Sequence, residues 1–101
     1  MHMNVFQGDI LKFDGKSVPM LVVSNDRFNE SGQAICCPID CQRSSNHLHA
    51  YIEGKNISGE VYCEQVLYLD LSQRSYKKID EVGLSTLMVV SDIIQGIVDY
   101  I

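Results

Sequence analysis

The sequence contains no long hydrophobic run, and no stretch approaches the ~18 apolar residues that a membrane span requires. Its first letters, MHMNVF, also lack the apolar segment of a signal peptide, so we expect a cytoplasmic protein without a membrane partner. No internal repeat, low-complexity stretch or linker divides the chain. With 101 residues, we expect one domain over residues 1–101, in which residues 1–3 are a disordered leader or an expression remnant.

Basic residues are missing from the C-terminal end. All eight Lys and Arg lie within residues 1–78, whereas residues 79–101 hold four of the thirteen acidic residues. The formal net charge of −5 therefore comes mostly from one end of the chain. This distribution argues against a protein that binds nucleic acid mainly by bulk charge, but it leaves a polyanionic partner open.

The four cysteines do not follow the pattern of a disulfide framework. Cys36 and Cys37 are adjacent, and on a strand their side chains would point to opposite faces. A zinc site would need Cys37 and Cys41 together with His47 and His49, but neither pair has a familiar zinc-finger spacing. We therefore expect buried, reduced thiols, and neither a metal nor another cofactor.

Short apolar segments about ten residues apart predict several strands. Turn-forming residues separate them, and one helical turn is an alternative for part of the loop at 24–32. Such spacing is typical of a small barrel or a strongly coiled sheet. The expected strands cover residues 8–13, 20–23, 34–39, 49–53, 60–64 and 66–69.

The C-terminal segment has a different periodicity. From Leu84 to Ile101 apolar residues recur at steps of three and four, which predicts an amphipathic helix packed on the sheet, with Ser85 as its N-cap. Gly96 costs a helix about 1 kcal/mol relative to Ala, so either close packing explains it or the helix ends there. The predicted fold is mainly β: a small antiparallel barrel closed by a C-terminal α-helix.

The order of several motifs resembles the MazF/PemK family of toxins. The resemblance is carried by GDI near the start, PMLVVSNDRFN, CCPID, and GEVYCEQ followed by VLYLD, and it extends over nearly the whole chain. It implies an SH3-like barrel of the CcdB/MazF type, a homodimer and metal-independent cleavage of single-stranded mRNA at specific sequences. It also implies neutralisation by a cognate antitoxin. In the CcdB branch the same fold poisons gyrase, so fold alone does not define the function.

Three positions depart from the pattern of that family. The family usually has Arg directly before the proline and again two residues after Gln65, where this chain has Val18 and Leu67. It usually has Thr where the strand CCPID ends in Asp40. Among the residues to which the family's chemistry is usually assigned, Gln65 and Asp70 match.

Metal-free RNA cleavage uses the 2′-hydroxyl as nucleophile and needs a base, an acid and cationic donors for the phosphorane. Since two usual arginines are absent, other cations must replace them. The predicted catalytic set is Lys16, Asp40, Arg43 and His47. The predicted RNA-binding residues are Gln65, Asp70, Arg74 and His49.

Each predicted site residue also has a purely structural interpretation. Asp40 at a strand end is more often a turn or capping residue than a base, and Lys16 and Arg43 lie in ordinary polar loops. His47 and His49 would face opposite sides of a strand, so at most one faces a site. Two functions stay open: a ribonuclease toxin, or a nuclease-dead or CcdB-like relative that acts by protein contact, for example by inhibiting a topoisomerase.

Overall fold

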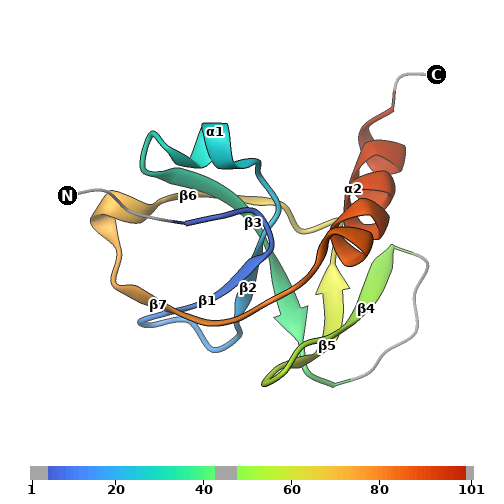
Figure 1. Ribbon diagram of the computed structural model, residues 1–101, viewed down its shortest axis with the longest axis horizontal. Coiled ribbons are helices and arrows are strands. Elements are labelled where there is room, and N and C mark those ends of the chain that lie inside the picture. The colour runs from blue at the N-terminus through green and yellow to red at the C-terminus, as the bar shows by residue number, and fades with distance from the viewer. Residues whose placement is uncertain (1–4, 43–47, 100–101) are drawn as a thin grey trace.

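The computed structural model describes residues 5–42 and 48–99. A curled antiparallel sheet forms most of the molecule, and a C-terminal helix stands against one end of it (Figure 1). This arrangement confirms the predicted fold class. The strands are β1 (Asp9–Phe13), β2 (Met20–Val22), β3 (Gln33–Asp40), β4 (His49–Glu53), β5 (Ser58–Tyr62), β6 (Leu67–Asp70) and β7 (Tyr76–Glu81). The helices are α1 (Asp26–Asn29), the single 3₁₀ turn η1 (Leu71–Gln73) and α2 (Leu84–Val98).

Strand β3 organises the sheet because it is long enough for two partners in succession. Its first half pairs with β6 and its last two residues pair with β5, while β2 takes the opposite edge. The strand order is β4-β5-β3-β2-β1-β7, with β6 beside β3. The end of β3 therefore meets the β4–β5 hairpin, and its beginning meets η1 and β6.

Each face of the central strands has its own hydrophobic core. Cys36 lies in a core enclosed by β1, β2, β3, β6 and η1, whereas Cys37 lies in a second core that Val90 of α2 covers. Adjacent residues alternate between the two cores, as predicted for these cysteines, and this explains why β2 and β3 are apolar on both faces. Burial raises the pKa of both thiols to about 12.

Helix α2 differs from the prediction at both ends. Gly83 is the N-cap and provides no side-chain hydrogen bond, so the prediction of Ser85 as the cap is wrong. The helix continues through Gly96 to Val98, and a Cβ at position 96 would meet nothing within 4 Å. Neither explanation considered for Gly96 is therefore correct.

The helix also packs on the sheet through a narrower face than its periodicity predicts. Val90 is buried, and Ile93 and Ile94 pack against the same core. Leu87 is half-buried, and Ile101 lies outside the described residues. The predicted packing is wrong for the four residues of the predicted apolar face that are exposed. Their exposed fractions are 73% for Leu84, 58% for Met88, 43% for Ile97 and 73% for Val98.

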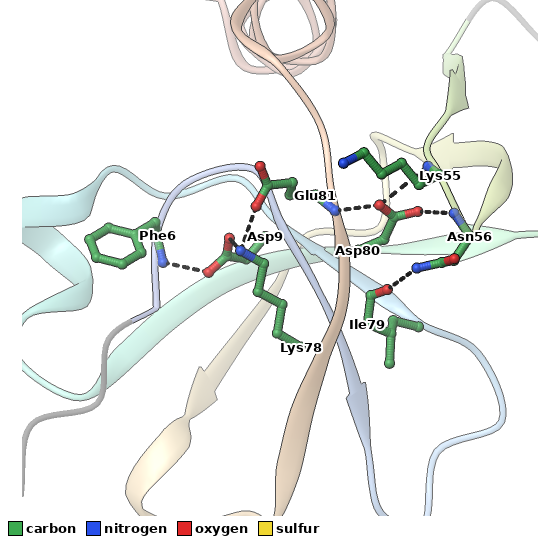
Figure 2. Close-up of polar contacts among 8 residues, drawn as sticks. All are labelled: Phe6, Asp9, Lys55, Asn56, Lys78, Ile79, Asp80 and Glu81. Atoms are coloured by element: carbon green, nitrogen blue, oxygen red, sulfur yellow. Dashed lines mark hydrogen bonds and ion pairs between the residues drawn. The ribbon is translucent and has the colours of Figure 1, made fainter.

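Strand β7 was not predicted, since the one buried side chain in it is a carboxylate. Figure 2 shows how the Asp80 carboxylate accepts hydrogen bonds from the backbone N–H groups of Asn56 at 2.7 Å, Glu81 at 2.8 Å and Lys55 at 3.3 Å. Ile57 N–H adds a fourth bond at 2.9 Å. Asp80 thus ties the β4–β5 turn to β7.

A second carboxylate lies nearby on β1. The Asp9 carboxylate accepts a hydrogen bond from Phe6 N–H at 2.9 Å and lies 3.2 Å from the Lys78 ammonium, which also contacts Glu81 (Figure 2).

Within residues 5–42 and 48–99, no helix is long and apolar enough to cross a bilayer.

Candidate functional site

A pocket of about 380 Å³ lies where β3 ends. The turn before β2, the end of β3, the end of β5 and the segment after β5 contribute its walls. Its lining is largely apolar, and its polar groups come from an aspartate, a tyrosine and two glutamines. The lining residues are Val18, Pro38, Ile39, Asp40, Gln42, Tyr62 and Gln65.

The Asp40 carboxylate is held by two donors at this pocket. The Tyr62 hydroxyl donates to Oδ2 at 2.6 Å, and the backbone N–H of Gln42 donates to Oδ1 at 2.8 Å. These bonds, that from Tyr62 first, keep the pKa of the Asp40 carboxyl below its ordinary value. At neutral pH the pocket therefore contains an ionised carboxylate in a defined orientation.

The ring of Tyr62 stacks on the imidazole of His49. The ring centroids are 3.9 Å apart and the planes differ by 3°. The two residues are direct partners in the β4–β5 ladder, so the hairpin register creates this stack.

The His49 side chain is 6% exposed and lies between two carboxylates. Its Nε2 is 3.3 Å from Glu64 Oε2, and its Nδ1 is 3.6 Å from Glu60 Oε1. Among the described residues, no group makes a hydrogen bond with Nδ1. The imidazole thus has little surface left for a direct contact with RNA.

Of the four predicted catalytic residues, only Asp40 is found at the pocket in the described part of the chain. Lys16 is half-buried in the β1–β2 loop and is not among the lining residues. Arg43 and His47 lie outside the described residues.

The predicted RNA-binding residues are spread over both ends of β3. Gln65 lines the pocket. Asp70 pairs with Gln33 at the other end of β3, roughly 20 Å from Asp40 at ~3.3 Å per residue. Its carboxylate caps η1 by accepting hydrogen bonds from Ser72, and Arg74, exposed, follows that turn.

The two aliphatic replacements have different places. Val18 lines the pocket with Pro38 and Ile39, whereas Leu67 lies on β6, 40% exposed and away from the lining residues. None of the described residues that line the pocket is a Lys or Arg. The described part of this pocket therefore provides hydrogen-bonding groups and one negative charge, but no positively charged side chain that could bind a phosphate.

Tyr62 was not among the predicted site residues. The available signal was the turn at 54–56, which separates two predicted strands. The register of the resulting hairpin decides which residue faces His49. That register could not be read to the residue, because the predicted second strand, 60–64, begins two residues after the observed one, Ser58–Tyr62.

No group of three or more His, Cys, Asp or Glu in the described ranges could hold a metal ion. The two cysteines considered as zinc ligands lie in different environments, since Cys37 is buried in a core and Cys41 is exposed.

Comparison with known proteins gives the following similarities. A family model described as a PemK-like, MazF-like toxin of a type II toxin-antitoxin system matches residues 6–98. No curated protein matches the chain. A chain in the crystal structure of MazE-MazF from Deinococcus radiodurans matches with a TM-score of 0.87 and 18% identity, covering 97% of this chain and 99% of that one.

Two mycobacterial structures are also similar. An endoribonuclease from a mycobacterial species matches with a TM-score of 0.80 and 16% identity, covering 93% of this chain and 90% of that one. An endoribonuclease in complex with its cognate antitoxin, also mycobacterial, matches with a TM-score of 0.77 and 16% identity, covering 91% and 92%. At these identities the likeness shows a shared fold.

Proposed function

Since the chain belongs to the family of PemK-like, MazF-like toxins of type II toxin-antitoxin systems, we propose that it is a cytoplasmic endoribonuclease. It cleaves single-stranded mRNA at short sequences without a metal, and a cognate antitoxin neutralises it. The observation that carries this proposal is the pocket at the end of β3, where an oriented, ionised Asp40 lies beside Gln65. Two similar structures are described as endoribonucleases, and one of them is bound to its antitoxin.

In the proposed reaction the ribose 2′-oxygen attacks phosphorus and the P–O5′ bond breaks, which leaves a 2′,3′-cyclic phosphate. Asp40 accepts the 2′-hydroxyl proton, and His47 protonates the leaving O5′. Arg43 and Lys16 supply the positive charge that the phosphorane needs. Gln65 contacts RNA at the pocket, and Asp70 and Arg74 contact it where the strand extends along β3 towards η1.

The test is cleavage of a 5′-labelled single-stranded RNA by the purified chain in the presence of EDTA. We expect discrete cuts whose 5′ fragments end in a cyclic phosphate. Asp40→Asn, Arg43→Ala and His47→Ala should each lower the rate at least about tenfold. Arg27→Ala on α1, exposed and outside the pocket, is the matched control and should cleave like the wild type. Intact RNA at micromolar protein would refute the proposal.

We also propose that the toxin is a homodimer. The support is the apolar surface left on α2 at Leu84 and Met88 and on the neighbouring segment at Val66, Leu67 and Tyr68, which are 40–73% exposed. Val66 lines one groove with Leu87 and Ile94 of α2, so apolar groups of the two segments meet there. Monomers rarely leave large apolar patches in water. The antitoxin would then place an acidic or amphipathic segment over the pocket and exclude RNA.

A second function is favoured by one observation, the absence of Lys and Arg among the described residues that line the pocket, where Val18 stands instead. A nuclease-dead or CcdB-like protein would use this surface for protein contact. The same preparation that leaves RNA intact would then inhibit supercoiling by a topoisomerase. Cleavage of RNA together with unaffected supercoiling excludes this second function.

A further inference from the structure

We infer that Tyr62 is a positioning residue for Asp40, and that the imidazole of His49, which lies between Glu60 and Glu64, fixes the ring of Tyr62. This inference rests on the proposed ribonuclease function, and it gives four residues of that site a positioning role that neither the sequence motifs nor the comparisons provide. The following paragraphs give its steps from the pocket inwards.

The first step is the hydrogen bond between the Tyr62 hydroxyl and Asp40 Oδ2, at 2.6 Å. Gln42 N–H binds the other carboxylate oxygen. A carboxylate on a short side chain at a strand end would otherwise rotate about its χ angles. With one donor on each oxygen, its remaining lone pairs have a defined direction, which a base that must meet a 2′-hydroxyl requires.

The second step is the fixation of the phenol itself. Tyr62 is the last residue of β5, where a side chain has little support from the strand beyond it. The parallel His49 ring at 3.9 Å covers one face of the phenol and restricts its tilt. Two contacts therefore direct the hydroxyl towards Asp40: the stacked imidazole, which restricts the phenol ring, and the hydrogen bond itself.

The third step is the support of His49. Glu60 and Glu64 approach the two ring nitrogens from the same hairpin, at 3.6 and 3.3 Å. With a carboxylate near each ring nitrogen and the phenol on one face, the imidazole has little room to tilt or rotate. Glu60 is also the ladder partner of Asp40, so the groups that support the phenol and the carboxylate that it contacts belong to one continuous β4–β5–β3 pairing.

The experiment is steady-state cleavage of a defined single-stranded RNA by Tyr62→Phe, which keeps the stacked ring and removes only the hydroxyl. We expect kcat to fall about tenfold with KM unchanged, because orientation of the base is lost and RNA contact is not. Tyr76→Phe, half-buried on β7 and outside the pocket, is the matched control and should match the wild type. His49→Gln, which removes the stacked ring, should lower kcat in the same way.

Two further readouts separate positioning from general damage. In a double-mutant cycle, Tyr62→Phe should have almost no additional effect in an Asp40→Asn background. By carbon NMR of the free protein, the pKa of the Asp40 carboxyl should rise in Tyr62→Phe and stay in place in Tyr76→Phe, since the Tyr62 hydroxyl is the main cause of its low value.

The outcomes are distinguishable. If the wild type cleaves RNA and Tyr62→Phe is equally fast, or changes KM instead of kcat, the inference is overturned while the proposed function stands. If the wild type does not cleave RNA at all, the proposed function is refuted and the inference fails with it. Folding of each variant is checked by its melting temperature before kinetics.

Discussion

Among individual residues, Asp80 is a buried carboxylate that connects two segments of the chain through hydrogen bonds. Its exposed fraction is 7%, and its carboxylate receives four backbone N–H groups from two separate segments. Burial raises the pKa of this carboxyl, but the hydrogen bonds, that from Asn56 first, outweigh burial and bring the pKa below its ordinary value. The ionised form is therefore part of the folded structure.

We predict that Asp80→Asn lowers the free energy of unfolding by about 1–3 kcal/mol at pH 7, because the amide cannot accept all four bonds. Since the folded pKa of Asp80 lies below its unfolded value of 3.8, the contribution is present above that value and disappears as pH falls through the folded pKa. Urea unfolding from pH 7 to pH 3 measures the difference in the free energy of unfolding between the wild type and Asp80→Asn. This difference should stay constant near neutral pH and become smaller only in the acid range. Glu53→Gln, exposed at the end of β4, is the control. A gap that persists unchanged at pH 3 would contradict the assignment.

The same scale shows what the sequence could and could not predict about the site. The motif that ends in Asp40 placed this residue at the end of a strand, and the structure puts it there at a pocket. Its partner Tyr62 depends on a strand register, and His49 was expected to face RNA although two glutamates surround it. Contacts between side chains distant in sequence are not encoded in local pattern, so these could not be foreseen.

At the level of elements, hydrophobic pattern was a good guide wherever a strand is buried. The strand His49–Glu53 was predicted with the observed bounds. β2 differs from its prediction by one residue at one end, and β3 by one residue at each end. β7 was missed because Lys77 and Lys78 are exposed and its buried residue is Asp80. The helix was found by periodicity, but periodicity cannot tell a face that meets the sheet from one that stays uncovered.

Two glycines should respond in opposite ways to the same substitution. Gly96→Ala should stabilise the protein by about 1 kcal/mol, because the helix continues through an open position. Gly59→Ala should destabilise it by about 1–3 kcal/mol, since the new Cβ would overlap the backbone carbonyl oxygen of Asp40. Thermal unfolding of the pair measures both effects. Equal shifts of the same sign would contradict the packing described for β3 and β5.

For the whole molecule, the uncovered apolar side chains bear on assembly. If Leu84, Met88 and their neighbours are shielded by a second copy, light scattering should give about twice the chain mass of 11.4 kDa. Leu84→Lys with Met88→Lys should shift the protein towards monomer at low concentration, whereas Lys77→Glu, exposed on β7, should not. A monomer at all concentrations would remove the support for a homodimer.

The division of the sheet into two cores also has a chemical consequence. Three thiols are sealed in those cores, and burial raises the pKa of Cys36 and Cys37 to about 12 and that of Cys63 to about 11. Cys41 is exposed and directly follows Asp40. The native chain should therefore take up a single maleimide adduct, visible by mass spectrometry, and four adducts only in denaturant. A fluorophore introduced in this way would sit at the rim of the pocket and could report docking of RNA or antitoxin without any engineered cysteine.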